Sequence, residues 1–374
     1  MLFVAGRGGK GMANLMDYLE WRGDVPLAAD PFGPVDNLVL AELAYVDFHG
    51  IVSETGDKVP LKEVRDTFYS THTREEFKQS SFAKRAPLLL DGMADGARFG
   101  GIELSDHINQ VDREKGEQMS AVTYHLPDGT VYVAFRGTDG TVVGWREDFD
   151  LSYADETPGQ VSAKGYLERI AEKYPSPLRV GGHSKGGNFA VYAASFCGEG
   201  VQDRILEVYS NDGPGFRERV LAFEGYRRIR DRILSIVPDT SIIGMLLDTD
   251  VPLRVVKSSA SGILQHDALT WQVLRNRFVE ASLSDMGKYI NKALDAWVAG
   301  MDDATRRSLI ETVFSMIEAT GMETFGDISE QKWKSAEAML SAAANLPKEK
   351  QQELLRMIGL LLQSGGKAAL PGNA

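Results

Sequence analysis

Ser184 lies in a sequence pattern that is typical of a serine nucleophile. The motif G-x-S-x-G spans residues 182–186, a short apolar run from Leu178 leads into it, and a helical pattern follows it to about Phe196. A strand–turn–helix of this kind holds a serine above a sheet, facing the backbone N–H groups at the start of the helix. The turn is so tight that glycine is required at the flanking positions. The pattern predicts a nucleophile elbow; the alternative is a glycine-rich turn in which the serine is incidental.

His266 is the residue best placed to activate Ser184. A serine hydroxyl becomes a good nucleophile when a base accepts its proton and a third group orients that base. In an enzyme with this elbow, the serine, the acid and the histidine follow one another in that order along the chain. His266 is the only histidine after Ser184, and it follows the last expected strand closely. We predict that it is the general base, against the alternative of an exposed loop histidine, and that His183 packs beneath the elbow.

The acid of this triad has two candidates. Asp212 follows the strand after the elbow, and Asp239 follows the next strand. Either strand end can deliver a carboxylate to the same imidazole, and the structural alternatives are a turn aspartate for Asp212 and a helix N-cap for Asp239. Asp267 adjoins the base and is expected to cap the helix that follows.

Acyl transfer also needs donors for the oxyanion of the transition state. The backbone N–H of Lys185, directly after the nucleophile, is one candidate. The second is Thr138, which follows an early strand and offers both a backbone N–H and a hydroxyl. This chemistry implies no metal and no organic cofactor.

The elements that must position these residues alternate between strands and helices. A hairpin with an Asp-Gly turn is expected over residues 120–135, and a basic, helical stretch over 216–232. The other expected elements are a helix at 161–173, a strand leading into Ser184, a helix to about 196, and strands at 205–209, 233–237 and 253–256. Such alternation predicts an α/β fold with a mostly parallel central sheet and the antiparallel hairpin toward its front edge.

The flanking regions have a helical character. Helices are expected over 12–22, over 37–45 with Asp36 as the cap, and around 75–84 and 86–99. After Trp271, helical apolar spacing covers 273–300, 304–320, 330–344 and 348–363. The expected organisation is an α/β-hydrolase domain with an N-terminal helical region over 12–271, an all-helical extension over 272–365, and a disordered tail over 366–374.

Composition narrows the setting. The 374 residues carry a net charge of −12, which disfavours nucleic acid and anionic membranes as bulk electrostatic partners. The single cysteine, Cys197, excludes an intramolecular disulfide and lies in an apolar helix, where core packing is its expected role. The N-terminus lacks the long apolar core of a signal peptide, and no apolar stretch is long enough to span a bilayer. We expect a cytoplasmic protein.

Several ordered motifs together resemble a known group of enzymes. The segment Val133–Thr138, then Trp145 and Asp148, then the G-H-S-x-G-G elbow are similar to the class 3 lipases among the α/β-hydrolases. That resemblance implies that Thr138 contributes to the oxyanion hole and that Trp145 and Asp148 scaffold its loop. Over residues 12–271 the chain resembles a bacterial branch of lipase-like hydrolases; the marks are Asp17–Asp24, Asp212–Phe216, Ser241–Leu246 and Gln265–Asp267.

The chain also departs from the lipase pattern. Lys185 stands where the lipases usually have leucine, which predicts a charge near the pocket. Ser235 stands where their D-x-V-P segment carries the acid, and this favours Asp212, the place where pancreatic-type lipases keep theirs. A secretion signal and an obvious apolar lid are both missing from the sequence.

The function expected from the sequence is that of an intracellular serine esterase with a Ser-His-Asp triad and an acyl-enzyme intermediate. Its substrate would be a small-molecule acyl ester or a lipid-like ester. One alternative is hydrolysis of an amide or thioester by the same residues. The other is a catalytically silent, hydrolase-like interaction module. The C-terminal helices would pack on the parent domain or mediate homo-oligomer formation.

Overall fold

The computed structural model describes residues 13–78, 80, 82–289, 291–292, 300–318 and 348. Its centre is an eight-stranded sheet in which the strands lie side by side in the order in which they occur along the chain. The strands are β1 (Val59–Pro60), β2 (Glu103–Asp112), β3 (Glu117–His125), β4 (Val131–Phe135), β5 (Leu178–His183), β6 (Ile205–Asn211), β7 (Ile233–Pro238) and β8 (Leu253–Val256). Neighbours from β1 to β4 are antiparallel, and neighbours from β4 to β8 are parallel. The predicted mixed, mostly parallel α/β sheet is confirmed.

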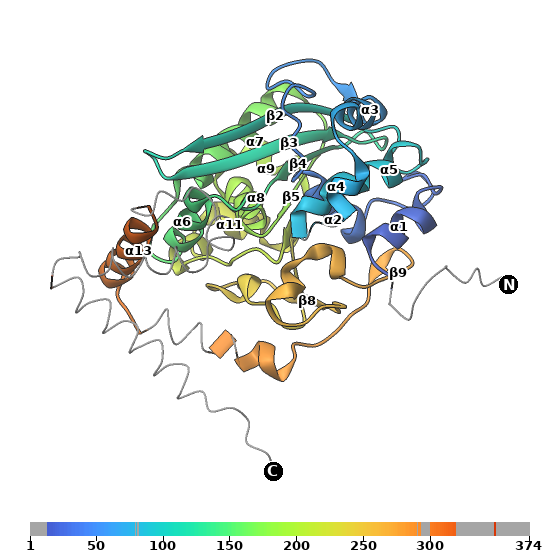
Figure 1. Ribbon diagram of the computed structural model, residues 1–374. Coiled ribbons are helices and arrows are strands. Elements are labelled where there is room, and N and C mark those ends of the chain that lie inside the picture. Colours follow the sequence, from blue (N-terminus) through green and yellow to red (C-terminus); the bar gives the residue numbers. More distant parts are fainter. Residues whose placement is uncertain are drawn as a thin grey trace, which may run out of the picture.

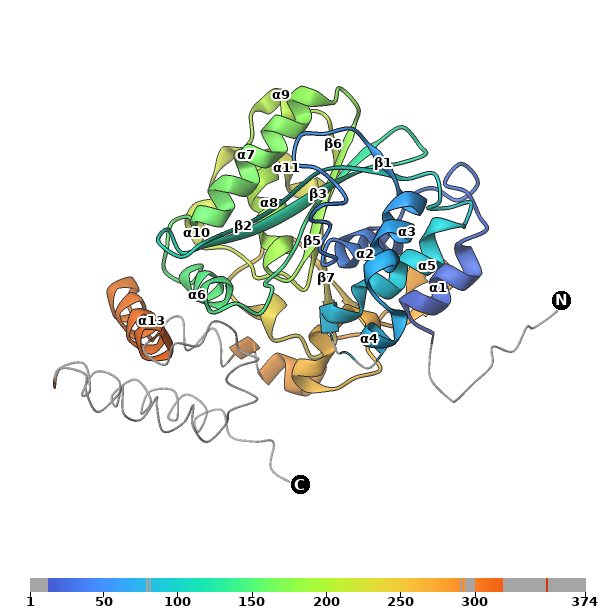
Figure 2. The same ribbon diagram turned by 45° about the horizontal axis from the view of Figure 1, so that its top comes forward.

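Helices cover both faces of this sheet (Figures 1 and 2). One face carries α1 (Leu15–Arg22), α2 (Pro34–Leu43), α3 (Leu61–Thr71) and α5 (Leu89–Ala94). The other carries α7 (Pro158–Lys173), α8 (Lys185–Phe196) and α11 (Glu224–Ile229). Strand β4 shows why two cores form: Tyr132 and Ala134 point into the first, whereas Val131, Val133 and Phe135 point into the second. This alternation with a period of two residues buries both faces of the strand.

Short helices connect and border these layers. They are α4 (Arg74–Lys78), η1 (Phe82–Leu88), α6 (Val142–Asp150), α9 (Glu199–Gln202), α10 (Glu218–Leu221), η2 (Arg230–Arg232), η3 (Ile243–Met245), η4 (Gly262–His266) and η5 (Ala268–Thr270). The connection from β4 to β5 runs through α6 and α7, and that from β5 to β6 runs through α8 and α9. Because β4 to β8 are parallel, their carboxyl ends meet at one edge of the sheet.

The start of α2 differs from the prediction. Asp36 does not cap a helix that begins after it, because Pro34 already occupies the first helical position and Gly33 is the N-cap. Asp36 instead lies inside the first turn, where its carboxylate accepts from the Gly33 N–H at 2.9 Å. It also accepts from Arg98 at 2.5 Å and from the Tyr18 hydroxyl at 2.7 Å, which joins α1 and α2 in the core.

The helix predicted from Val273 does not begin there. The chain forms a two-stranded hairpin, β9 (Val273–Leu274) and β10 (Arg277–Phe278), whose turn places Arg275 at φ 62°. Val273 and Phe278 are buried, and the Val273 N–H donates to the carbonyl of Ala13 at 2.8 Å. Val273 and Phe278 face the core from paired strands and are five positions apart, whereas one face of a helix repeats every three or four residues.

Further along, residues 285–289 and 291–292 are helical, and α13 (Asp303–Glu318) lies in the stretch predicted as a helix over 304–320. α13 packs on α6, where the rings of Phe314 and Phe149 are 5.9 Å apart between centroids (Figure 1). The helices predicted over 330–344 and 348–363 and the disordered tail over 366–374 lie outside the described residues, apart from helical Lys348. The division of the chain into a domain and an extension therefore stays a prediction.

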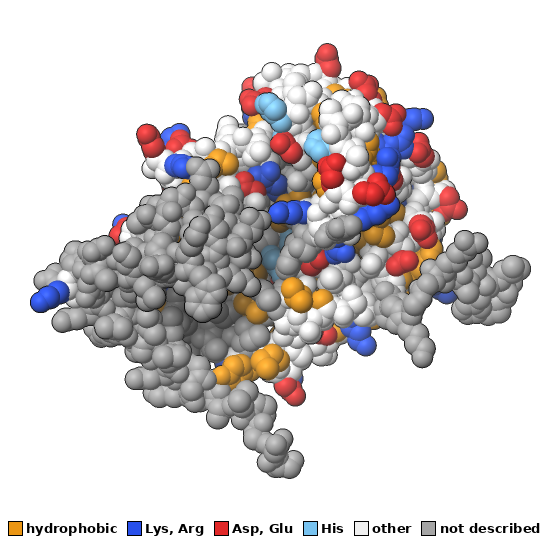
Figure 3. Space-filling view, in the orientation of Figure 1, with side chains coloured by type: hydrophobic (Ala, Val, Ile, Leu, Met, Phe, Trp, Pro, Cys, Tyr) orange, Lys and Arg blue, Asp and Glu red, His pale blue; other side chains and the backbone are white. Residues whose placement is uncertain are grey.

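Helix character, surface charge and the state of the cysteine can be compared with the expectations from composition. Among its helices, none combines the length and the apolar character that crossing a membrane requires. On the face drawn in Figure 3, acidic side chains lie among the basic ones, in keeping with the acidic composition. Cys197 is buried, and burial raises the pKa of its thiol to about 12, which fits the expected packing role.

Candidate active site

Ser184 occupies a sharp turn between β5 and α8. Its backbone has φ 57° and ψ −134°, a conformation that costs energy for a residue with a side chain. The glycines around it are required by close approach. A Cβ at Gly182 would lie 2.3 Å from the carbonyl carbon of Gly186, and a Cβ at Gly186 would lie 2.1 Å from the carbonyl oxygen of Phe135. The predicted strand–turn–helix with a serine at its apex is therefore present.

Three of the predicted side chains form one hydrogen-bonded chain. His266, the last residue of η4, places Nε2 3.0 Å from Ser184 Oγ and Nδ1 2.7 Å from Asp212 Oδ2. A carboxylate only accepts, so Nδ1 carries the hydrogen and the lone pair of Nε2 faces the serine hydroxyl. This is the tautomer that can accept the serine proton.

Burial and hydrogen bonds fix the orientation of the Asp212 carboxylate. The residue follows β6, is fully buried, and has φ 49°. Its second carboxylate oxygen accepts from the hydroxyl of Ser241 at 2.5 Å and from the N–H of Gly244 at 3.2 Å. Both oxygens thus have partners, which fixes the plane of the carboxylate toward the imidazole.

Asp239 contacts a neighbour of the base and not the base itself. Its Oδ1 accepts from Gln265 Nε2 at 2.8 Å, and Gln265 Oε1 accepts from the N–H of Thr240 at 2.8 Å. On the other side of the base, Asp267 caps η5 as predicted, through the N–H of Leu269 at 3.1 Å. Both aspartates therefore hold the segment that carries the imidazole.

His183 lies beneath the triad and contacts the backbone of its base. Its Nε2 is 2.9 Å from the carbonyl oxygen of His266, so this nitrogen carries the hydrogen and donates. Its Nδ1 then accepts from the Tyr45 hydroxyl, 3.0 Å away. Burial holds the pKa of His183 well below its usual value, which keeps the ring neutral. The sequence predicts the packing of His183 but not this hydrogen bond to the base.

Glu42 is a buried carboxyl group next to this network, and none of the sequence motifs includes it. Its Oε1 lies 3.4 Å from His183 Nδ1, and burial raises its pKa to about 8, with the charge of Asp267 adding to the shift. At neutral pH Glu42 is therefore protonated. The available signal is a single carboxylate within the apolar stretch from Leu38 to Ala44.

The loop that carries Thr138 lies directly against the nucleophile. A Cβ at Gly137 would lie 3.0 Å from Ser184 Cβ and 2.2 Å from the hydroxyl of Tyr45. The Thr138 hydroxyl donates to Asp148 Oδ2 at 2.5 Å. Burial raises the pKa of Asp148 to about 6, so at neutral pH it accepts this hydrogen and the Thr138 hydroxyl is engaged.

Lys185 differs from the expectation in where its charge lies. The side chain is fully buried, and its ammonium group is 3.0 Å from Glu147 Oε2, so the charge expected near the pocket is enclosed and paired. Glu147 also accepts from the backbone N–H groups of Gly159 at 2.6 Å and Gln118 at 3.1 Å. Two consecutive carboxylates of α6 therefore contact the residues of the two predicted oxyanion donors. Glu147 binds the side chain of Lys185, and Asp148 binds the side chain of Thr138.

Comparisons with known proteins show the family of this chain. The solved structure of M37 lipase is similar over 56% of this chain and 68% of that chain, with 12% identity and a TM-score of 0.36, a likeness too weak to support an argument. No curated protein matches the chain. Residues 93–315 match the Mbeg1-like family, and this range includes Thr138, the elbow, Asp212 and His266. Since the match covers more than half of the sequence, the chain belongs to the Mbeg1-like family.

Proposed function

We propose that the protein is a serine hydrolase that cleaves carboxylic esters through an acyl-enzyme intermediate. The observation that carries this proposal is the continuous hydrogen-bonded chain from Ser184 Oγ through His266 to Asp212, with both contacts at 3.0 Å or less. A serine hydroxyl in contact with an oriented neutral imidazole is the arrangement that activates a nucleophile. The resemblance to class 3 lipases supports the same reaction.

The proposed reaction has two halves. Ser184 Oγ attacks the ester carbonyl while His266 Nε2 accepts the hydroxyl proton, and Asp212 stabilises the imidazolium that forms. The N–H groups of Lys185 and Thr138 hold the oxyanion. Collapse of this intermediate passes the proton from His266 to the leaving alcohol, and the acyl group remains on Ser184. A water molecule, deprotonated by His266, then releases the acid and restores the serine.

The proposed substrate class is a small-molecule acyl ester or a lipid-like ester. The same residues can cleave amides and thioesters, because the tetrahedral intermediate and the proton transfers are the same. A catalytically silent module remains an outcome of the test below. The cytoplasmic location remains a prediction that rests on the sequence alone.

A fluorophosphonate probe on the purified full chain tests the nucleophile. We expect covalent labelling of the wild type, loss of labelling in Ser184→Ala, and retained labelling in Ser195→Ala. Ser195 is a matched control, because it is a buried serine of α8 whose hydroxyl donates only to the carbonyl of Val191 among the described residues. Labelling that persists in Ser184→Ala would overturn the proposal.

Turnover is then measured with p-nitrophenyl esters from acetate to dodecanoate. A burst of nitrophenol equal to the enzyme concentration is expected where deacylation is slower than acylation. Folded wild-type protein that neither reacts with the probe nor hydrolyses any of these esters, nor the matching p-nitroanilides and thioesters, would favour the silent module instead.

A further inference from the structure

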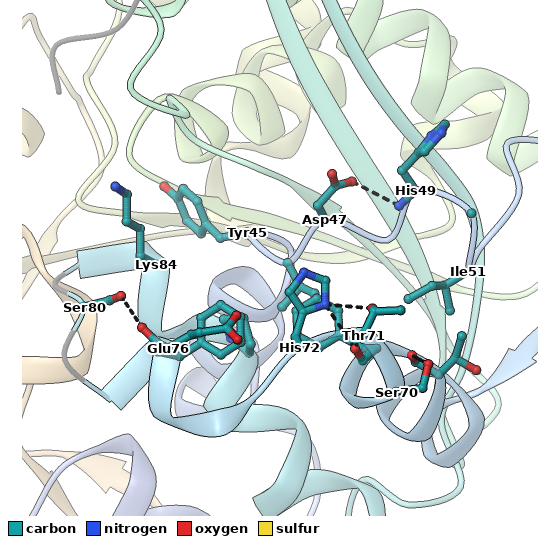
Figure 4. A pocket seen from close by; sticks show the side chains of 16 residues that line it. Tyr45, Asp47, His49, Ile51, Ser70, Thr71, His72, Glu76, Ser80 and Lys84 are labelled. Carbon is teal, nitrogen blue, oxygen red and sulfur yellow. Dashed lines mark hydrogen bonds between the residues drawn. The ribbon is translucent and has the colours of Figure 1, made fainter. Parts of the chain in front are cut away.

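A cleft of about 550 Å³ lies between the loop after α2 and the elements α3, α4 and η1. Figure 4 shows Tyr45 and Lys84 at one end of it and Ile51 and Ser70 toward the other. The volume falls within the range of about 300–1,000 Å³ that is usual for small-molecule sites. The cleft is therefore large enough for a ligand and extends in one direction from Tyr45.

The lining of the cleft has an apolar part and a charged rim of both signs. The apolar part consists of Val46, Ile51, Phe68, Phe77 and Pro87. The ring of Phe68 stacks on His72 with centroids 4.4 Å apart and lies 5.7 Å from the ring of Phe77. Asp47, Glu76 and Lys84 also line the cleft, so no single charge is selected, and the remaining polar lining consists of Tyr45, His49, Thr67, Ser70, Thr71, His72 and Ser80. These features suit an uncharged, apolar group.

Two contacts link residues at one end of the cleft to the sequence neighbours of Ser184 and His266. Tyr45 lines the cleft, and its hydroxyl contacts His183, the residue before the nucleophile, at 3.0 Å. Lys84 lines it as well, and the next residue, Arg85, pairs with Asp267, the residue after the base, at 2.6 Å. One end of the cleft is therefore connected, through Tyr45 and through the residue after Lys84, to the segments that carry Ser184 and His266.

The residues that line the cleft come from 45–87, whereas the family match begins at residue 93. The triad and the oxyanion loop lie inside the matched range. The cleft is therefore contributed by a segment of this chain that the family pattern does not cover. The catalytic residues would then lie in the matched range, and the residues that select the substrate would lie in the segment before it.

We propose that this cleft binds the apolar acyl group of the ester, with the carbonyl end at Tyr45 and Ser184. This inference rests on the proposed function. The acyl group fits the cleft better than the alcohol does, because it stays attached to Ser184 through the intermediate while the alcohol must leave for solvent. The apolar part of the cleft would hold the acyl chain in one position while water attacks the acyl-enzyme.

The test places a large side chain at the end of the cleft away from Tyr45. Thr71 and Ser70 are exposed residues of α3 that line the cleft, and Glu63 is an exposed residue of the same helix that does not. We expect Thr71→Trp and Ser70→Trp to lower kcat/KM for octanoate and dodecanoate esters about tenfold or more, while acetate changes less than about twofold. Glu63→Trp should keep the wild-type profile.

The outcomes separate this inference from the proposed function. If Ser184 reacts with the fluorophosphonate probe and esters are cleaved, but folded Thr71→Trp and Ser70→Trp keep the wild-type dependence on acyl length, the cleft is not the acyl site. If instead they change only the dependence on the alcohol, tested with methyl, phenyl and naphthyl acetates, the cleft holds the leaving group and our assignment is wrong. Absence of any reaction at Ser184 would contradict the proposed function itself.

Discussion

The triad and the cleft are built from different parts of the molecule. In the parallel half, Ser184 follows β5, Asp212 follows β6 and His266 comes after β8, so one edge of the sheet collects the chemistry. The cleft, in contrast, is lined by the loop after α2 and by residues of α3, α4 and η1, and not by the strands of the sheet. Parallel strands bring carboxyl ends together by topology alone. The lining of a cleft depends on how side chains of separate elements pack, and the order of the strands does not specify that packing.

The largest expected effect concerns the nucleophile and base. Ser184→Ala and His266→Ala should each lower kcat by several orders of magnitude, up to about 10⁶-fold, because neither residue activates the reaction without the other. The double variant should be no slower than the slower single variant. Steady-state kinetics on an ester that the wild type cleaves gives all the rates.

Controls must show that the loss of turnover in these variants is not caused by unfolding. Circular dichroism and thermal unfolding should show that the alanine variants fold. If the two losses multiply in the double variant, the residues act independently, and the triad interpretation is wrong.

The next prediction compares the two aspartates that follow β6 and β7. Asp212→Asn should lower kcat by about 10⁴-fold, since an amide at this position can leave the imidazole in the wrong tautomer. Asp239→Asn removes a charge that contacts Gln265 and not His266, so we expect far less loss, within about tenfold. Kinetics on both folded variants decides between them, and the reverse ranking would transfer the role of the acid to Asp239.

The parallel half is also the part that the sequence predicts well. Strands β5 to β8 were predicted within two residues at either end, because they are short apolar runs with turn residues at their ends. The glycine requirement at the elbow follows from the motif, and the only histidine after Ser184 is the one in contact with it. Asp212 was favoured over Asp239 by a resemblance, and its side chain is the one that contacts His266.

In the antiparallel half, the hairpin predicted over residues 120–135 is confirmed as β3 and β4, whereas β1 and β2 are not predicted. Strand β2 was missed within a charged region, because it buries polar residues where apolar ones signal a strand. Asp106 is buried at a bulge of β2, at φ 57°, and accepts from Lys173 and Tyr174 at 2.8 Å each. These partners are the last residue and the C-cap of α7, 67 and 68 positions away in sequence, and no local pattern encodes such a pairing. The cleft was not predicted at all, since its lining comes from four separate elements.

A smaller effect is expected at Thr138, where the two halves of the sheet meet. Removing a full oxyanion donor usually costs about 10²–10³-fold in kcat. The Thr138 hydroxyl is committed to Asp148, so Thr138→Val should cost only about tenfold, through a less well-positioned loop. Thr138→Ser keeps the hydroxyl and should stay within about twofold. A loss of 10³-fold in Thr138→Val, with KM unchanged, would instead identify the hydroxyl as an oxyanion donor.

The smallest expected effect on turnover concerns Glu42, and its main consequence is for stability. The pKa of Glu42 is raised to about 8 in the folded protein from 4.5, so the folded state holds this proton over a range in which the unfolded state has lost it. Where the folded state binds more protons, stability falls as pH rises. The wild type should therefore lose stability relative to Glu42→Gln between about pH 4.5 and pH 8, and the difference should level off above this range.

A glutamine at position 42 keeps the shape of the protonated carboxyl and cannot ionise. The free energy of unfolding of Glu42→Gln should exceed that of the wild type by several kcal/mol at about pH 9, with roughly 5 kcal/mol as the upper limit, and by little at about pH 4.5. Urea unfolding at both pH values measures the difference, with Glu63→Gln, an exposed glutamate of α3, as the control. Because Glu42 lies 3.4 Å from His183 Nδ1, its ionisation at high pH also disturbs the ring that holds the backbone of His266. The variant should consequently keep its activity to higher pH than the wild type, and an identical pH dependence of stability in both proteins would show that Glu42 is ionised throughout.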